Sequence, residues 1–477
     1  MGLPLPGERG LVSVMLTCSR SPFPLDSFMQ QRTAARPAST ITAEEAAGLV
    51  HSGMWLDFGG SIVQPDAFEV ALSKRAKELK NVKVRACLSV RPHQILAADP
   101  EGTAFHLVSW HFSLFDRLAH DEGRCTYAPL NLGEVPDYYR RFIDPIDIIV
   151  IKAAPPDAQG WLSTGPTNVW LRAAIERCKC LIIELWPQMP LAEGQGNRVH
   201  ISEVDYLIEA PDAPPFEMPS LPSTEVDRAV ATMLVNEIGD GACIQIGIGA
   251  MPNAVCSLLA QNAPRDLGIH TEMLTNGIID LYKTGQVTGA RKQIDQGKIV
   301  YTFALGDKHM YRTLGGNQDF CCYPVDYTNS PDTIARNHNV IAINNTTQID
   351  LQGQAASESD GHRHLTGTGG QLQFVRGAYQ SPGGKSFLLL SSVYERKGMR
   401  KSRIVLNLTP GNIVTTPRSD QMYIVTEYGM TCLKGRSVAE RALALIKLAH
   451  PDFRDELERQ AYDKRLIPRG FTFGQGE

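Results

Sequence analysis

Residues 242–253 read ACIQIGIGAMPN, and this stretch decides the fold class. The mostly apolar run Ala242–Ile246 predicts a buried strand. Gly247 and Gly249 predict a sharp turn after it, and the sequence from Asn253 onward predicts a helix. A strand that passes into a helix through glycines is the repeating unit of α/β proteins with parallel sheets.

The residues that precede this strand predict a capped helix and a linker. Thr224 can cap the helix, apolar residues recur over 226–238, and Gly239 ends it. Residues 211–222 read PDAPPFEMPSLP, a proline-rich composition that is typical of linkers. We therefore expect a domain boundary at this stretch.

The N-terminal half of the chain repeats the same order of elements. Thr42 and Glu45 match a capping box for a first helix. The run Met54–Phe58 then predicts a strand, and Gly59 and Gly60 predict a turn. Duplication of one unit explains this recurrence, and chance recurrence of a common α/β element is the alternative.

Other strand-like runs alternate with helical segments along the chain. They lie at residues 146–151, 180–185, 298–303, 340–343, 387–390 and 403–406. This alternation predicts an α/β fold with two similar open domains whose sheets are largely parallel. The predicted divisions are a disordered extension (1–36), an N-terminal domain (37–210), the linker (211–222) and a C-terminal domain (223–477).

Composition argues against several classes of protein. With 477 residues, 43% of them hydrophobic and 21% charged, the chain suits a globular protein of two or more domains. Its net charge of −4 argues against nucleic-acid binding, and no apolar run reaches the ~20 residues of a membrane span. The ten cysteines lack zinc-site spacing, which predicts reduced thiols, no metal and a cytoplasmic location.

The glycine turn is the first segment that could carry chemistry. Glycines let a ligand approach the main chain, and the start of the following helix leaves N–H groups unpaired. Such a turn can hold a pyrophosphate or a developing oxyanion. It matches neither a P-loop nor a dinucleotide fingerprint, because Pro252 stands near the place of the third glycine. A purely structural turn is the alternative.

A glutamate follows the next predicted strand. Residues 268–277 read GIHTEMLTNG, and Glu272 stands where a short strand (267–271) passes into a loop and then a helix (278–284). The carboxyl ends of parallel strands are where α/β sheets place reactive groups. A surface or capping role is the alternative for Glu272. For His270, on the same face of the strand, a hydrogen-bonded structural role is favoured.

A second glycine-rich segment and two polar residues also follow predicted strands. Residues 366–378 read TGTGGQLQFVRGA, and three glycines in four residues indicate close approaches that side chains would forbid. A flexible surface loop is the alternative, although the segment leads directly into an apolar stretch. Asn344 and Glu427 each stand just after an apolar strand, where a capping or turn role is the alternative.

Together and in this order, these segments resemble the family I CoA-transferases. The likeness is greatest to the branch of 4-hydroxybutyrate and butyryl-CoA:acetate CoA-transferases, which is grouped with acetyl-CoA hydrolase/transferase proteins. It covers roughly residues 41–447, and its segments are PQMP (187–190), VHIS (199–202), GIGAMP (247–252), HTEM (270–273), PVDYTN (324–329), GTGGQ (367–371), FVRGA (374–378), TEYG (426–429) and LKGRS (433–437).

The resemblance implies a CoA-transferase (NagB/RpiA-like) fold with an active site between the two domains. It implies that Glu272 is a covalent nucleophile, that the backbone at Ile248 and Gly370 binds oxyanions, and that Asn344 and Glu427 orient carboxylates. The residues expected to contact coenzyme A are Gly247, Gly249, Ala250, Met251, Pro252, Asn253, Gly367, Gly369, Gln371 and Lys397. Coenzyme A enters as a substrate, without a permanently bound cofactor.

Two departures from the family pattern leave the identity of the carboxylic acid substrate undetermined. Trp186 stands where asparagine is expected, and Gln373 stands where relatives often carry aspartate. The first half shapes the acid pocket in this family, and the residues that suggest an unusual pocket are Trp55, Gln64, Trp110 and Trp161. The alternatives for the acid are 4-hydroxybutyrate, butyrate, acetate, succinate and itaconate, the branched dicarboxylate of the itaconate CoA-transferases.

Two other functions compete with CoA transfer. An acyl-CoA hydrolase would use the same site with water as the acceptor, and CoA release with and without an acceptor acid separates the two. A non-catalytic ligand-binding α/β protein would bind without a covalent adduct. The expected partners are an acyl-CoA, a small carboxylic acid and further copies of the chain in a dimer or tetramer, with no nucleic acid and no membrane.

Overall fold

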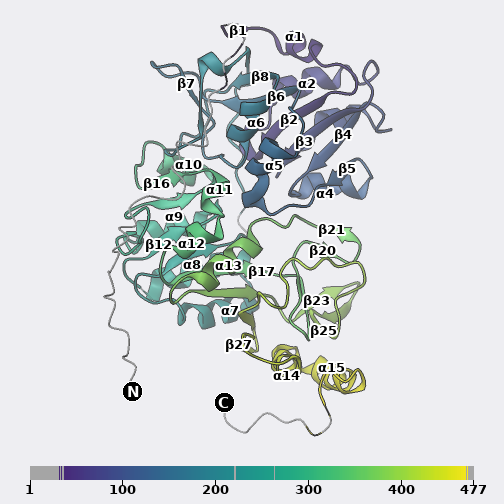
Figure 1. Cartoon of the computed structure of the whole chain (residues 1–477), viewed down its shortest axis with the longest axis vertical. Helices are drawn as coiled ribbons and strands as arrows, with labels where there is room; N and C mark the ends of the chain where they lie inside the picture. The colour runs from purple at the N-terminus through teal and green to yellow at the C-terminus, as the bar shows by residue number, and fades with distance from the viewer. Residues whose placement is uncertain are drawn as a thin grey trace, which may run out of the picture.

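The structure is a computed structural model that describes residues 32, 34, 37–219, 222–262, 264–468 and 470. The predicted extension (1–36) lies outside the described residues apart from Arg32 and Ala34. The described chain forms two α/β lobes that lie one above the other in Figure 1, with the N-terminal lobe at the top.

The N-terminal lobe contains an eight-stranded sheet in which every neighbouring pair is parallel. In spatial order its strands are β1 (Ser39–Thr40), β10 (Tyr206–Glu209), β8 (Cys180–Leu185), β6 (Ile148–Ala153), β2 (Trp55–Gly60), β3 (Val82–Cys87), β4 (Phe105–Ser109) and β5 (Cys125–Tyr127). One face packs on α1 (Ala43–Gly48), α2 (Ala67–Ser73), α3 (Gln94–Ala98) and α4 (Leu114–Asp121), and the other on α5 (Val135–Arg141) and α6 (Leu171–Arg177).

The C-terminal lobe contains a second eight-stranded sheet, parallel except for its last pair. In spatial order its strands are β16 (Phe320–Cys322), β14 (Ile299–Tyr301), β12 (Gly268–His270), β11 (Cys243–Ile246), β17 (Val340–Asn345), β22 (Lys385–Leu389), β26 (Tyr423–Thr426) and β27 (Gly429–Cys432). One face packs on α7 (Glu225–Val235), α8 (Ala250–Asn262), α9 (Asn276–Lys283) and α10 (Lys308–Leu314), and the other on α12 (Pro331–Ala335) and α13 (Gln371–Gln380).

The two sheets follow the same plan. In each, the first strand after a capped helix (β2 or β11) is central, the next three strands lie outward on one side, and the later strands lie outward on the other. The predicted fold class is therefore confirmed, and the shared strand order supports duplication over chance recurrence. The exact domain divisions stay a prediction; β10 ends at Glu209 and α7 begins at Glu225, on either side of the proline-rich stretch.

Local signals in the sequence explain where the first helices begin. Thr42 and Glu45 form the predicted capping box at α1, and Thr224 forms another with Asp227 at α7. The helix after the glycine turn begins at Ala250, three residues earlier than predicted. Pro252 is tolerated there because the first turn of a helix needs no N–H donor.

The remaining elements surround the C-terminal sheet. Three of them are pairs of strands: β13 (Met273–Leu274) with β15 (Phe303–Ala304), β20 (Ser359–Asp360) with β21 (Arg363–His364), and β23 (Val393–Arg396) with β24 (Met399–Ser402). A three-stranded sheet contains β18 (Gln348–Asp350), β19 (Ala355–Ala356) and β25 (Ile404–Val405). The helices are α11 (Val325–Thr328), α14 (Val438–Leu448) and α15 (Pro451–Asp463). In the N-terminal lobe β7 (Trp161–Ser163) pairs with β9 (Arg198–His200). The predicted strand 403–406 therefore belongs to a small sheet and not to the main one.

Candidate active site

Glu272 lies at the carboxyl end of β12, between β12 and β13. Its carbonyl oxygen accepts hydrogen bonds from the N–H groups of Thr302 (3.0 Å) and Phe303 (3.3 Å). Thr302 is the matching interruption between β14 and β15, and Phe303 begins β15. Glu272 is therefore held at the end of the sheet where parallel α/β folds gather their reactive groups.

Two donors hold the Glu272 carboxylate. The amide Nδ2 of Asn329 donates to Oε2 over 2.5 Å, and the N–H of Gly370 donates to the same carboxylate. Burial raises the pKa of Glu272 from 4.5 to about 7, while the two donors act to lower it. A Cβ atom on Gly370 would lie 2.1 Å from Oε2, so only glycine fits there.

The raised pKa predicts how the reaction depends on pH. A carboxylate attacks only in its ionised form, so kcat/KM for acyl-CoA should rise about tenfold per pH unit below pH 7 and level off above it. Initial rates from pH 5 to 9 measure this profile, with circular dichroism as the check that the fold is unchanged. A rate that is already constant from pH 5 upward would contradict a Glu272 pKa near 7.

Asn329 was not predicted as a site residue, although it ends the segment 324–329 that carried part of the resemblance. Its N–H donates to the Val325 carbonyl (2.8 Å), and His270 Nε2 hydrogen-bonds the carbonyl of Thr328 (2.8 Å). Burial lowers the pKa of His270 to about 3, so its ring is neutral. The structural interpretation of His270 agrees with these contacts: its ring supports the turn that presents Asn329 to Glu272.

The second glycine segment joins the two lobes. The N–H of Leu132 donates to the Gly369 carbonyl (3.0 Å), and the N–H of Thr368 donates to the Tyr127 hydroxyl oxygen (2.9 Å). Both partners belong to the N-terminal lobe, so that lobe holds the loop that places Gly370 against Glu272. The alternative of a flexible surface loop is wrong, because the loop is tied down across the lobe interface.

Tyr127→Phe should therefore slow the reaction without weakening acyl-CoA binding. The ring packing of Tyr127 remains, but the acceptor for the Thr368 N–H is lost and Gly370 is less firmly placed. We expect kcat to fall about tenfold while KM for acyl-CoA changes by less than about twofold. Steady-state kinetics measure both, with Tyr138→Phe, which loses only a 3.5 Å hydrogen bond to Glu134, as the control. An unchanged kcat would show that the interlobe contact does not position the loop.

The first glycine turn lies beside Glu272 on the same edge of the sheet. β11 neighbours β12, and the register that pairs Ile244 with Ile269 brings Gly247 level with Glu272. The Ile248 side chain is 46% exposed, and its carbonyl accepts from Asn345 Nδ2 (3.2 Å). The predicted CoA contacts Ala250, Met251, Pro252 and Asn253 form the first turn of α8, and the turn also includes Gly249, with φ +128°.

Asn344 and Glu427 are not paired with Glu272. Asn344 exchanges two hydrogen bonds with the Gln245 amide (3.1 and 3.0 Å), and Glu427 accepts from the N–H (2.9 Å) and hydroxyl (2.5 Å) of Ser392. β17 and β26 lie two and four strands from β12, so at about 4.8 Å per strand their ends are roughly 10 and 19 Å from Glu272. A role for either toward a second carboxylate stays a prediction.

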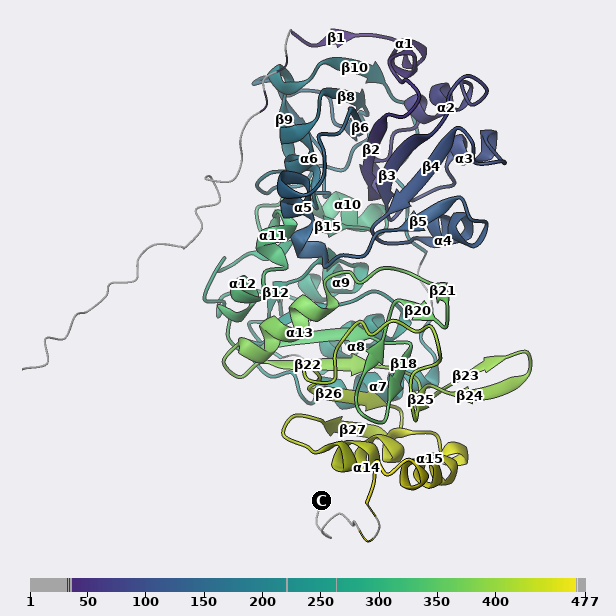
Figure 2. The same cartoon turned by 45° about the vertical axis from the view of Figure 1, so that its right-hand side comes forward.

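The other predicted CoA contacts lie at three places. Gly367 approaches the N-terminal lobe so closely that a Cβ there would lie 2.6 Å from the Trp110 carbonyl oxygen. Gln371 starts α13, and its Nε2 donates to the hydroxyls of Ser357 and Thr416 (2.9 Å each). Lys397 is exposed at the tip of the β23–β24 hairpin, which projects from the C-terminal lobe in Figure 2.

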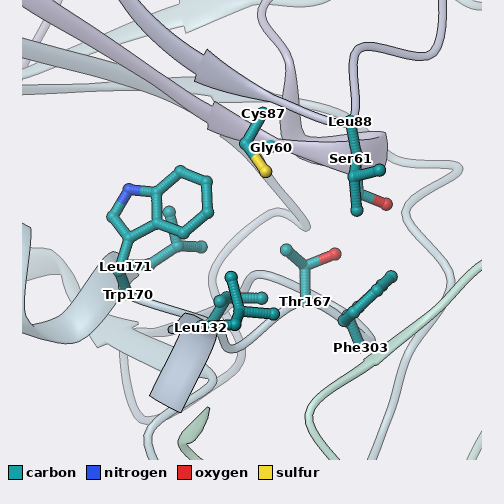
Figure 3. A pocket seen from close by; sticks show the side chains of 10 residues that line it. Gly60, Ser61, Cys87, Leu88, Leu132, Thr167, Trp170, Leu171 and Phe303 are labelled. Atoms are coloured by element: carbon teal, nitrogen blue, oxygen red, sulfur yellow. The ribbon is translucent and has the colours of Figure 1, made fainter. Parts of the chain in front are cut away.

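A small cavity opens beside Glu272, between the ends of β2 and β3 and the C-terminal lobe. Its volume is about 10 Å³, room for about one water molecule, and its lining residues are Gly60, Ser61, Cys87, Leu88, Leu132, Thr167, Val169, Trp170, Leu171 and Phe303. Figure 3 shows Ser61, Cys87 and Thr167 around the same space as Trp170 and Phe303. Trp55, Gln64, Trp110 and Trp161 do not line this cavity, and their part in the acid pocket stays a prediction.

From the sequence we expect reduced thiols, no metal site and no membrane span. Within the residues that the structure describes, no group of three or more His, Cys, Asp or Glu side chains could hold a metal. Cys321 and Cys322 carry free thiols. None of the helices in the described ranges is both long and apolar enough to cross a membrane.

Comparison with known proteins places these features in one family. The acetyl-CoA hydrolase/transferase N-terminal domain matches residues 28–216, and the C-terminal domain of the same family matches residues 306–461. Butyryl-CoA:acetate CoA-transferase of Anaerostipes caccae is 43% identical over 431 residues, which are 90% of this chain and 97% of that protein. 4-Hydroxybutyrate coenzyme A transferase of Clostridium kluyveri is 36% identical, covering 89% of this chain and 97% of that one.

A solved structure shows the same architecture. The crystal structure of RipA from Yersinia pestis superposes with a TM-score of 0.81 at 35% identity, covering 93% of this chain and all of that one. Glu272 falls between the two matched domains, but the full-length relatives extend over nearly the whole chain. The chain belongs to the acetyl-CoA hydrolase/transferase family.

Proposed function

We propose that this chain is a CoA-transferase that moves coenzyme A from an acyl-CoA to a small carboxylic acid through a covalent Glu272 intermediate. The observation that carries the proposal is the buried Glu272 carboxylate, whose Oε2 accepts from Asn329 Nδ2 and which also accepts from the Gly370 N–H. The relatives named above, which transfer CoA to or from butyrate, acetate and 4-hydroxybutyrate, support the reaction class.

The first half-reaction makes a glutamyl thioester in two steps. Oε1 of Glu272 attacks the acyl-CoA carbonyl carbon, the carbon–sulfur bond breaks, and CoA leaves as a thiolate. The thiolate then attacks the glutamyl carbonyl carbon of the resulting anhydride, whose bond to the acyl carboxylate breaks and releases the first acid. A second carboxylate reverses both steps, so the kinetics are ping-pong and no proton is transferred.

The held oxygen explains how the protein lowers the barrier. When the thiolate attacks the glutamyl carbonyl, negative charge develops on the oxygen derived from Oε2. The Asn329 amide already points at that atom, and the Gly370 N–H donates to the same carboxylate, so both donors are in place before the attack. The loss of one such donor costs about 3 kcal/mol in comparable sites. The turn at Ile248 remains the candidate for the charge on the acyl oxygen in the first step.

The coenzyme tail supplies binding energy away from the reacting atoms. Contacts along the glycine turns can hold the pantetheine and phosphates while the thioester is brought to Glu272. Hydrolysis by the same site is the alternative function, and it differs only in the nucleophile that resolves the thioester. The relatives named above are transferases, and this favours transfer over hydrolysis.

A trapping experiment tests the proposal. The protein is incubated with butyryl-CoA, reduced with borohydride, digested and analysed by mass spectrometry, beside a sample without butyryl-CoA. A mass change on the peptide that contains Glu272, and CoA release that depends on an added acceptor acid, are the expected results. A modified residue other than Glu272, or an unmodified protein under turnover, overturns the mechanism. CoA release at the same rate without acceptor favours the hydrolase.

Two further predictions stay open. A cytoplasmic location is supported by the free, buried thiols of Cys321 and Cys322, which are typical of a reducing compartment. The dimer or tetramer implied by the resemblance is to be measured by light scattering.

A further inference from the structure

Gln373 lies in the first turn of α13, close to Gly370. Gly370 is the N-cap of this helix, and Gln373 is the third helical residue. A glutamine in this position commonly turns back and accepts a hydrogen bond from the N–H of the N-cap residue, as in a capping box. In this protein the Gly370 N–H donates to the Glu272 carboxylate. The start of α13 therefore brings two candidate acceptors, Gln373 and Glu272, to one N–H group.

The Gln373 amide is held by the other lobe instead. Its Oε1 accepts a hydrogen bond from the N–H of Gly133 (2.9 Å), which belongs to the 3-10 turn Leu132–Glu134 of the N-terminal lobe. Gln373 is 8% exposed, so its amide oxygen depends on a protein donor. The N–H of Leu132 donates to the Gly369 carbonyl (3.0 Å). Two consecutive N–H groups of one turn therefore hold the loop and the helix that meet at the N-cap.

The same turn packs against Asn329, the other donor to Glu272. A Cβ on Gly133 would lie 2.8 Å from Asn329 Cβ and 2.6 Å from Gln373 Nε2, so only glycine lets the three residues meet. Asn329 Oδ1 is buried and has no hydrogen-bond partner among the described residues. The Asn329 amide is therefore oriented by its hydrogen bond from Nδ2 to Glu272 and by packing, to which Gly133 contributes.

We propose that Gln373 is a positioning residue for CoA transfer, because its hydrogen bond with Gly133 keeps the Gly370 N–H available to Glu272. If the turn at Gly133 moved away, Gln373 Oε1 would lose its donor and would accept the N–H of its own N-cap residue. Glu272 would then share one of its two donors with Gln373. The inference rests on the proposed function, since it assigns a residue that acts through the groups around the Glu272 nucleophile.

Gln373→Met tests this role because it keeps the length of the side chain and removes the acceptor. Gly370 and Asn329 are then less firmly placed, and we expect kcat to fall about tenfold while KM for acyl-CoA changes by less than about twofold. The Gly370 N–H favours the ionised form of Glu272, so a weaker contact should also raise the pKa of Glu272. The midpoint of kcat/KM against pH should move upward by about half a pH unit.

A double variant tests the competition for the Gly370 N–H. Gly133→Ala places a Cβ 2.6 Å from Gln373 Nε2, which must separate the turn from the amide. Oε1 can then accept the Gly370 N–H, and we expect kcat to fall about 100-fold. Addition of Gln373→Met to Gly133→Ala removes the competing acceptor and should raise kcat by at least about threefold. A double variant that is no more active than Gly133→Ala overturns the inference.

Gln380→Met is the matched control, because Gln380 is exposed at the other end of α13 and should retain wild-type kinetics. Thermal melts show which variants are folded, and Gln373→Ala, which also removes the acceptor, replaces Gln373→Met if that variant does not fold. Wild-type kcat and an unmoved pH midpoint in a folded Gln373 variant overturn the inference, while a trapped Glu272 adduct leaves the transferase function standing. A wild-type protein without transfer activity overturns both.

Discussion

Replacement of Glu272 by Ala or Gln should abolish CoA transfer, with a fall in kcat of at least about 10⁴-fold. Neither side chain can form the anhydride or the thioester, so no residual covalent route remains. Glu272→Asp should lose at least about 100-fold, because the shorter side chain draws the carboxylate more than an ångström away from Asn329 and Gly370. Transfer rates with butyryl-CoA and a labelled acceptor acid measure all three.

Glu272→Gln should also make the protein more stable than wild type at alkaline pH. The folded pKa of Glu272 is about 7, against 4.5 for an unperturbed glutamate, so the folded state favours the protonated form. Its contribution to stability is fully present below pH 4.5 and is lost as the pH rises through 7. Glu272→Gln cannot ionise, and at pH 8 we expect it to be more stable than wild type by about 2 kcal/mol.

Urea unfolding at pH 5 and pH 8 distinguishes these expectations. The stability difference between Glu272→Gln and wild type should be larger at pH 8 than at pH 5, while the inactive variant keeps its native circular dichroism. Wild-type activity retained in Glu272→Ala, or a Glu272→Gln variant that is inactive because it is unfolded, would contradict the role assigned to the side chain.

Gly370→Ala should lower kcat about 10³-fold. A methyl group at this position would lie 2.1 Å from Glu272 Oε2 and 2.2 Å from Asn329 Nδ2, far inside contact distance. The loop, the carboxylate or the amide must move, and the alignment of both donors with the held oxygen is lost. Because the substitution acts at the reacting group, kcat should change more than KM for acyl-CoA.

A glycine outside the site provides the matched control. Gly48 lies in α1, and a Cβ there would meet no atom within 4 Å, so Gly48→Ala should retain wild-type kinetics. Thermal melts of both variants separate a local effect from global unfolding. A Gly370→Ala variant with kinetics like those of Gly48→Ala would show that the close approach at residue 370 has no role in catalysis.

The short-range features of this protein could be predicted from its sequence. Capping residues, apolar runs and glycine turns are local, so the helices at Thr42 and Thr224 and the succession of strands along each half of the chain followed from the pattern. Glu272 was predicted as a site residue because it stands just after a strand and because short contiguous segments resemble the family. Strand 298–303 was predicted as one run, but its interruption at Thr302, level with Glu272, depends on the neighbouring strand.

The partners of Glu272 could not be predicted in the same way. Asn329 is 57 residues away in sequence, and its amide reaches Oε2 only because α11 and the His270 contact orient the turn. Asn344 and Glu427 stand after strands, as predicted, yet the strand order puts them two and four strands from β12. Chain position alone does not give strand order, because parallel strands can be joined in many orders.

The sequence by itself determined the α/β class and the two similar halves, and it indicated Glu272 as the candidate nucleophile. Each of these depends on residues close together along the chain. The packing of the two lobes decided the rest. It brought Tyr127 to Thr368 across 241 residues and placed Phe303 against the ends of β2 and β3. Contacts of this kind depend on how two surfaces meet, and no local pattern of residues encodes that geometry.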